Sequence, residues 1–290
     1  MRAESKLKRY TPGRNQQDFA HEMTLLYGIE ILDFRFDTEE HILITFPNHT
    51  HQRSAYLRSL IRTPNPLIVD AFACIGADTM ALMADFPRAQ MFAVQRTGSD
   101  KELERFQRLT HNTALFNQTF YGGRCALVTV PLKIEKFLSN VRRQIDLLYL
   151  DPPWGDDTGT PHPDQTVIDY AASVLALAQP PPKVVVMKLR PAIRDKLNGY
   201  TLARSLEIKA YRSNSVLYYF HVFVVDTKRI NDPVLEKNAC SCQSPPSAPH
   251  PTIPCASGPP KACEVQHSDA EMEAGISRLV LPIDSAGMSC

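Results

Sequence analysis

Residues 147–155 read Leu-Leu-Tyr-Leu-Asp-Pro-Pro-Trp-Gly, an apolar run that stops at a carboxylate and two prolines. A short run that is apolar at every position is typical of a parallel strand buried on both faces. Proline lacks a backbone N–H and has a fixed φ, so the strand cannot continue through Pro152 and Pro153. We therefore predict a strand over 145–150 whose carboxyl end carries Asp151.

A second run of this kind lies about eighty positions earlier. Residues 67–72 read Leu-Ile-Val-Asp-Ala-Phe, and a turn of small residues then leads into a helix that we expect over 78–85. In an open α/β sheet, ligands bind at the carboxyl ends of strands near such a turn. The turn contains one glycine, Gly76, so it does not match the three-glycine dinucleotide-binding pattern.

Apolar runs and helical patterns alternate outward from these two segments, as they do in βαβ units. The pattern predicts an α/β fold: a doubly wound, mostly parallel sheet with a C-terminal antiparallel strand pair. The expected strands are 41–46, 67–72, 90–95, 126–130, 145–150, 183–189, 202–211 and 216–225. The expected helices are 18–27, 48–61, 78–85, 99–115, 134–141, 166–178 and 191–198.

The composition is that of an ordinary globular chain. The chain has 290 residues, of which 43% are hydrophobic and 22% charged, and a formal net charge of +1. These values exclude collagen, coiled coil and wholesale disorder. No apolar run approaches the ~18 residues of a membrane-spanning helix, and no apolar stretch follows the charged N-terminus. We therefore expect neither a membrane segment nor a secretory signal.

We divide the chain into three parts. Residues 1–45 are an N-terminal extension with a helix and a strand, 46–226 are the α/β domain, and 227–290 are a tail rich in Pro, Ser and Cys. The tail almost lacks large apolar residues over 238–261, so we expect it to be disordered and available to protein partners.

The seven cysteines do not resemble a secreted disulfide framework. Cys74 and Cys125 lie in apolar segments, and the other five follow residue 239. The cysteines of the tail have C-x-C and C-x₇-C spacings, not the C-x₂-C spacing of structural zinc sites, so we expect no metal. A reducing, intracellular compartment is therefore expected, nuclear or cytoplasmic, and we expect a monomer.

Each residue type after the strand 145–150 has a use in binding a nucleobase. The carboxylate of Asp151 can accept a hydrogen bond from an exocyclic amino group. Trp154, the single tryptophan of the chain, offers a flat face on which a base can stack for ~1–3 kcal/mol. Gly155 relieves crowding beside the ring. We therefore interpret this segment as a substrate site, in preference to a turn packed over a tryptophan.

The Asp-Pro-Pro-Trp motif after the fourth strand of the α/β domain resembles that of S-adenosylmethionine-dependent methyltransferases that modify exocyclic amino groups of bases. The small-residue turn precedes the motif, an order that excludes the permuted adenosine-methylating family. The longer match, D-A-F-x-C-x-G-x-D-T followed by D-P-P-W-G, resembles the trimethylguanosine synthase family, which methylates guanine N2 of RNA caps. The similarity extends over about residues 45–225.

The resemblance implies S-adenosyl-L-methionine as cofactor and capped RNA as partner, and it assigns roles to matching positions. The cofactor would be bound by Asp70, Phe72, Cys74, Gly76, Asp78, Thr79 and Gln95. The catalytic residues would be Asp151, Pro152, Pro153 and Trp154. The substrate would be bound by Trp154, Gly155, Lys188 and Arg190.

Two positions depart from the family pattern. Gln95 stands where the family usually has an acidic residue that accepts both ribose hydroxyls, and Pro131 stands near the usual adenine-binding acid. Two alternatives therefore remain open. One is an amino methyltransferase with another acceptor, such as adenine in RNA or DNA or a protein glutamine. The other is a methyltransferase-like fold that has lost its cofactor and serves as a scaffold.

Two further side chains receive structural interpretations. In 2′-O methyltransferases, a lysine at about the position of Lys188 deprotonates a ribose hydroxyl. We instead interpret Lys188 as a side chain at the end of its strand that reaches to water. His49 precedes the first motif at the start of a helix, and we interpret it as facing solvent.

Overall fold

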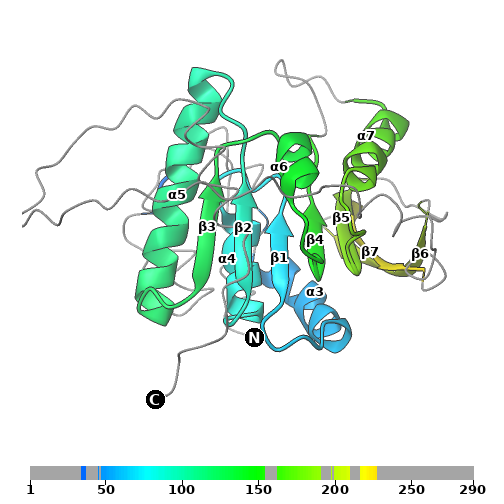
Figure 1. Cartoon of the computed structure of the whole chain (residues 1–290), viewed down its shortest axis with the longest axis horizontal. Coiled ribbons are helices and arrows are strands. Elements are labelled where there is room, and N and C mark those ends of the chain that lie inside the picture. Colours follow the sequence, from blue (N-terminus) through cyan, green and yellow to red (C-terminus); the bar gives the residue numbers. More distant parts are fainter. Residues whose placement is uncertain are drawn as a thin grey trace, which may run out of the picture. The chain divides into compact units, whose positions relative to one another are not determined.

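The computed structural model describes residues 34–36, 45, 47–153, 162–190, 197, 199–209 and 216–226 (Figure 1). Seven strands of this part of the chain form one sheet in the order β3-β2-β1-β4-β5-β7-β6. Strands β1 to β5 are parallel, and β7 is antiparallel to both β5 and β6. The predicted fold class is thereby confirmed. The bounds are β1 Leu67–Asp70, β2 Gln90–Val94, β3 Ala126–Val130, β4 Leu147–Leu150, β5 Val184–Leu189, β6 Tyr200–Lys209 and β7 Val216–Val225.

Helices pack on both faces of the sheet. Helix α3 contacts α4 and α4 contacts α5, whereas α6 contacts α7 (Figure 1). Met91 of β2 belongs to the cluster under α3 and α4, while its neighbour Phe92 packs its ring 5.4 Å from Phe137 of α6 on the other face. The bounds are α3 Pro47–Leu60, α4 Ala77–Asp85, α5 Asp100–Tyr121, α6 Ile134–Asn140 and α7 Asp164–Ala176.

Local signals explain where the helices begin and end. Ser99 caps α5 by accepting a hydrogen bond from the N–H of Glu102. Helix α5 continues to Tyr121, six residues beyond the predicted end, because Gly122 adopts the left-handed conformation that closes a helix (φ 58°). Helix α3 begins at Pro47 rather than after Asn48, since proline suits the first helical turn. The predicted helix 18–27 lies outside the described residues, as do strand 41–46 except Thr45 and helix 191–198 except Leu197, which forms an isolated β-bridge with Tyr200.

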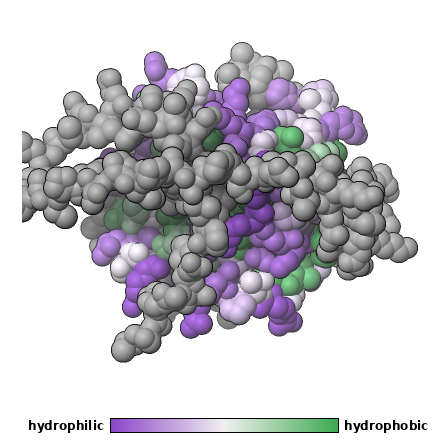
Figure 2. Space-filling view, viewed as in Figure 1, coloured by the Kyte–Doolittle hydropathy of each residue, from purple (hydrophilic) through white to green (hydrophobic). Residues whose placement is uncertain are grey.

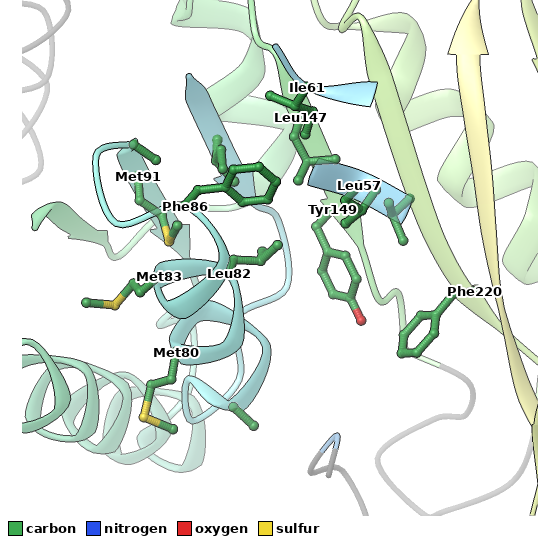
Figure 3. Packing of buried hydrophobic residues seen from close by; sticks show 14 of the residues in the cluster. Leu57, Ile61, Met80, Leu82, Met83, Phe86, Met91, Leu147, Tyr149 and Phe220 are labelled. Carbon is green, nitrogen blue, oxygen red and sulfur yellow. The ribbon is translucent and has the colours of Figure 1, made fainter. Parts of the chain in front are cut away.

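The main core lies between the sheet and helices α3 and α4. Figure 3 shows Leu57 of α3, Ile61 directly after this helix, Met80, Met83, Met91 and Phe86 gathered over this face. Tyr149 and Phe220 belong to the same cluster, with the Tyr149 hydroxyl directed away from Leu147.

The described surface is mostly hydrophilic on the face shown in Figure 2, with small separate hydrophobic areas. Four large apolar side chains are strongly exposed among the described residues: Leu103, Leu177, Val216 and Leu217. No helix in this part of the chain is both long enough and apolar enough to cross a membrane. The predicted divisions at 45 and 226 stay a prediction, and the cysteine-rich tail lies outside the described residues.

Candidate functional site

The two sequence segments meet where the strand order of the sheet reverses. The chain proceeds from β1 to β2 and β3 on one side, and then returns to β4 on the other side of β1. The crevice outside the carboxyl ends of such strands is where ligands bind in open α/β sheets. The turn after β1 is tied to both neighbours, because Ala71 N–H donates to Tyr149 O (2.9 Å) and Ala73 N–H donates to Val94 O (3.0 Å).

The turn after β1 is held in a defined conformation. Cys74 has a left-handed backbone (φ 50°), and its N–H donates to Oε1 of Gln95 at 3.1 Å. The Gln95 amide nitrogen donates in turn to the carbonyl of Arg96. Gln95 therefore braces the turn instead of presenting both amide atoms outward. Asn112 of α5 adds a second brace by donating to Ile75 O at 3.0 Å.

Asp70 ends β1 with a fully buried carboxylate. Its Oδ2 accepts a 2.6 Å hydrogen bond from the Thr79 hydroxyl, whereas its Oδ1 is buried without a partner among the described residues. Burial, and then the negative charge of Asp78, raise the pKa of Asp70 to about 7. Asp70 therefore changes charge near neutral pH.

Asp78, in the first turn of α4, is paired on both oxygens. Arg53 of α3 donates to Oδ1 at 2.7 Å and Thr45 donates to Oδ2 at 2.5 Å. Burial would raise the pKa of Asp78, but the positive charges of Arg53 and Lys188 hold it below its usual value. Asp78 is therefore ionised, and both of its oxygens accept hydrogen bonds from side chains of this chain.

Arg53 is itself fully buried and links the polar groups to the aromatic core. Its guanidinium lies 4.7 Å from the ring centroid of Tyr149 and 5.0 Å from that of Phe220, both within cation–π range. Burial disfavours the charge of Arg53, but Asp78 outweighs burial and raises the pKa of the guanidinium. Arg53 thus remains a cation beneath the site.

Asp151 and Lys188 form a close ion pair. Lys188 Nζ lies 2.6 Å from Asp151 Oδ2, and the two side chains are only 5% and 19% exposed. Burial raises the pKa of Asp151 to about 6, although Lys188 opposes the rise. The interpretation of Lys188 as a side chain reaching to water is wrong, because its ammonium is enclosed against Asp151.

His49 is also buried, so its interpretation as a solvent-facing residue is wrong. Its Nδ1 lies 2.7 Å from the Tyr218 hydroxyl, which belongs to β7. Burial, and then the charge of Lys188, lower the pKa of His49 to about 4, so the imidazole is neutral at pH 7. We refer below to Arg53, Asp70, Asp78, Asp151 and Lys188 together as the buried charge cluster.

The other predicted site residues lie around this cluster or outside the described part. Phe72 is half-buried, with its ring 5.9 Å from that of Tyr170 in α7. Pro152 is buried, while Pro153 and Arg190 are exposed. Trp154 and Gly155 lie outside the described residues, so their stacking role stays a prediction. Within the described residues, no group of three or more His, Cys, Asp or Glu side chains is arranged to hold a metal ion.

Sequence reasoning missed Thr45, Arg53, Tyr149 and Tyr218. Thr45 precedes α3, and the other three come from α3, β4 and β7 in turn. No short motif contains them. Arg53 is one of two arginines in a polar helix, and only the packing of α3 against α4 reveals that it faces inward.

No protein-family model matches the sequence, and no curated protein sequence is significantly similar to it. Solved structures do resemble the chain in fold. A precorrin-6y C5,15-methyltransferase from Geobacter metallireducens is 14% identical over 69% of this chain and 96% of that chain, with a TM-score of 0.42. An rRNA methylase from Streptococcus thermophilus is 11% identical over 63% and 98%, with a TM-score of 0.39. TYW2 from M. jannaschii, in complex with AdoMet, is 14% identical over 62% and 77%, with a TM-score of 0.39. Similarities at this level do not identify a function, so the residues of the site must do so.

Proposed function

We propose that this chain is an S-adenosylmethionine-dependent methyltransferase that acts on an exocyclic amino group of a nucleobase, with guanine N2 of an RNA cap as the leading acceptor. One observation carries the proposal: the turn after β1 and the Asp-Pro-Pro segment after β4 end adjacent strands at the point where the strand order reverses. The sequence resemblance assigns the cofactor to the first segment and the acceptor to the second. Their adjacency is what a transfer between cofactor and acceptor requires.

The residues at this point suit a cationic cofactor. Asp70 places a buried carboxylate, with one oxygen unpartnered among the described residues, directly under the turn. The side chains of Phe72 and Cys74 are half-buried at the turn, and Ala71 and Ala73 beside them are small. Because Asp70 is enclosed, it would not touch the ligand. Its negative charge would attract the cationic ligand from below, while the residues of the turn would make the direct contacts.

The chemistry assigned to the protein is positioning. When bound, the cofactor supplies an electrophilic methyl group on a sulfonium. Asp151 would accept a hydrogen bond from the acceptor's amino group and orient the nitrogen lone pair. Pro152 and Pro153 fix the backbone beside Asp151, and Trp154 would stack on the base. A strong general base is not required, because methylation leaves the nitrogen positively charged and its proton acidic.

A second candidate function has one observation in its favour. Gln95 uses its amide oxygen to accept from Cys74 N–H, so a ribose hydroxyl would have to compete with that hydrogen bond. A scaffold that has lost its cofactor would have such an arrangement. The two candidates differ in a simple measurement, which is whether the folded chain binds S-adenosylmethionine.

Isothermal titration of the full chain with S-adenosylmethionine tests the cofactor. We expect affinity to rise between pH 6 and pH 8, as Asp70 ionises around its pKa of about 7. Asp70→Asn should weaken binding at pH 8 about tenfold, the effect of ~1.4 kcal/mol. The control is Lys183→Gln, which removes the ion pair with Asp146 at the end of β5 away from the site. This variant should bind S-adenosylmethionine normally. If the unmodified chain gives no heat at millimolar cofactor, it is not a methyltransferase.

Methyl transfer from radiolabelled S-adenosylmethionine tests the acceptor. Capped RNA, uncapped RNA and single-stranded DNA are compared at equal concentration, and the methylated nucleoside is identified by mass spectrometry. The proposal expects N2-methylated guanosine from capped RNA alone. Label on adenine, or equal labelling with and without a cap, would replace the guanine-N2 assignment with the adenine alternative.

A further inference from the structure

The backbone places Lys188 directly beside Asp151. Strands β4 and β5 are parallel with Leu150 opposite Met187, so one step further in this register brings Asp151 opposite Lys188. Opposite residues of neighbouring strands point to the same face of a sheet. The 2.6 Å contact between Nζ and Oδ2 is therefore built into the strand pairing.

Aromatic and polar groups around the ammonium hold it in place. Nζ lies 5.0 Å from the ring centroid of Tyr218, which attracts a cation over its face. The Tyr218 hydroxyl is in turn paired with His49 of α3. Three elements, β5, β7 and α3, thus fix the position from which Lys188 contacts Asp151.

Lys188 remains an ammonium and does not act as a base. Burial would lower the pKa of Lys188, but the carboxylates of Asp151 and Asp78 raise it above its usual value. A lysine that removes a proton from a substrate needs the reverse shift. The pair therefore supports a role through Asp151 and disfavours direct deprotonation of a ribose hydroxyl.

The surroundings of Asp151 make its charge dependent on this lysine. Asp78 of α4 adds negative potential at Asp151, and Arg53 of α3 opposes it. Removing one partner of a buried ion pair leaves the other charge uncompensated. Without Lys188, the carboxyl of Asp151 would keep its proton at neutral pH. The groups whose charges act on this region are Arg53, Asp70, Asp78 and Lys188, with neutral His49, Tyr149 and Tyr218 beside them.

We infer that Lys188 is a positioning residue: its ammonium holds the Asp151 carboxylate in one orientation and in its ionised form, so that the carboxylate accepts a hydrogen bond from the substrate. The part of this inference that concerns the substrate rests on the proposed function. The part that concerns the charge of Asp151 does not, and the two parts have separate tests.

Lysine side-chain NMR tests the charge of Asp151 in the ligand-free full chain. Lysines are labelled at Cε, and the Lys188 signal is assigned as the one that disappears in both Lys188→Gln and Lys188→Arg. We expect this signal to shift with a midpoint near pH 6, the pKa of Asp151, and to lose that step in Asp151→Asn. The Lys183 signal is the control, because its partner Asp146 has a lowered pKa and should show no step there. A Lys188 signal that is flat near pH 6, or a step that survives Asp151→Asn, overturns the inference.

The pH profile of methyl transfer to capped RNA tests the consequence for the substrate. In Lys188→Gln the acid limb should move from near pH 6 to about pH 7–9, because an opposite charge nearby typically lowers a carboxyl pKa by ~1–3. Transfer should therefore fall by about threefold to a few hundredfold at pH 6.5, depending on where in that range the limb lies, and recover toward pH 9. Lys188→Arg keeps the charge and should keep the limb near pH 6, and Lys183→Gln should leave the profile unchanged.

A loss in Lys188→Gln that is equal at every pH would indicate a merely structural role and would overturn the inference. Absence of transfer by the unmodified chain would count against the proposed acceptor alone. The NMR titration would then still decide whether Lys188 controls the charge of Asp151.

Discussion

Replacing the buried Asp70 with Asn should make the protein more stable at alkaline pH. Asn is isosteric with the protonated carboxyl of Asp70. Its oxygen can accept from Thr79 as Oδ2 does, and its NH₂ takes the place of Oδ1, which has no partner among the described residues. The substitution therefore preserves the shape of the site and removes only the ionisation.

The magnitude follows from the pKa of Asp70, which burial and Asp78 raise from 3.8 to about 7. Between these two values the folded protein holds a proton that the unfolded chain has lost, so its stability falls as pH rises. Each pKa unit corresponds to about 1.4 kcal/mol, so ionisation of Asp70 costs about 4 kcal/mol in full. Asn does not ionise, and its advantage over Asp should grow by about 3 kcal/mol between pH 5 and pH 8.

Urea unfolding of both chains at pH 5, 6, 7 and 8, at fixed ionic strength and without ligand, measures this difference. Asp146→Asn is the control with the opposite sign. Burial would raise the pKa of Asp146, but Lys183, Leu67 N–H and Thr63 lower it, so its removal should destabilise equally from pH 5 to pH 8. An Asp70→Asn effect that is the same at pH 5 and pH 8, or destabilising at pH 8, would refute the reasoning.

Two further substitutions test the frame around the site. Gly76→Ala should lose about 1–3 kcal/mol of unfolding free energy, because Gly76 has a φ of +98° and an added Cβ would lie 2.8 Å from Thr113 Cγ2. In Gly122→Ala the φ is also positive but the space is open, so urea unfolding should show the smaller loss. Arg53→Met should lose about 3–5 kcal/mol by stranding the buried Asp78 carboxylate. The double variant Arg53→Met, Asp78→Asn should recover part of that loss, measured as a coupling energy in the same assay.

The strands, the fold class and the location of the site could be predicted because each depends on local pattern. The strands 67–70 and 147–150 are buried at every residue, and the predicted carboxylates lie at their carboxyl ends: Asp70 is the last residue of the first strand and Asp151 directly follows the second. Because both faces of a parallel sheet are covered, a short run of apolar residues predicts a strand of such a sheet with little ambiguity. The residues beyond them then fall at one edge of the sheet.

The partners of the site residues could not be predicted, because long-range packing selects them. Asp78 pairs with Arg53, 25 positions away, and Lys188 with Asp151, 37 positions away. The resemblance placed Asp78 beside the cofactor, whereas both of its oxygens contact other side chains of the chain. Gln95 directly follows β2, near the expected strand end, but the left-handed Cys74 that it contacts has no signal in the sequence.

The buried charge cluster explains why these carboxylates behave differently. Within the described residues it contains three carboxylates and two cations, because His49 is neutral at pH 7. Asp78 contacts Arg53 and feels Lys188, so its pKa falls, whereas burial leaves Asp151 raised to about 6 and Asp70 to about 7. Among the described residues, Asp70 lacks a contacting cation and carries the remaining proton near neutrality. A cationic ligand at the turn above it would supply the missing positive charge, as the sulfonium of the proposed cofactor would.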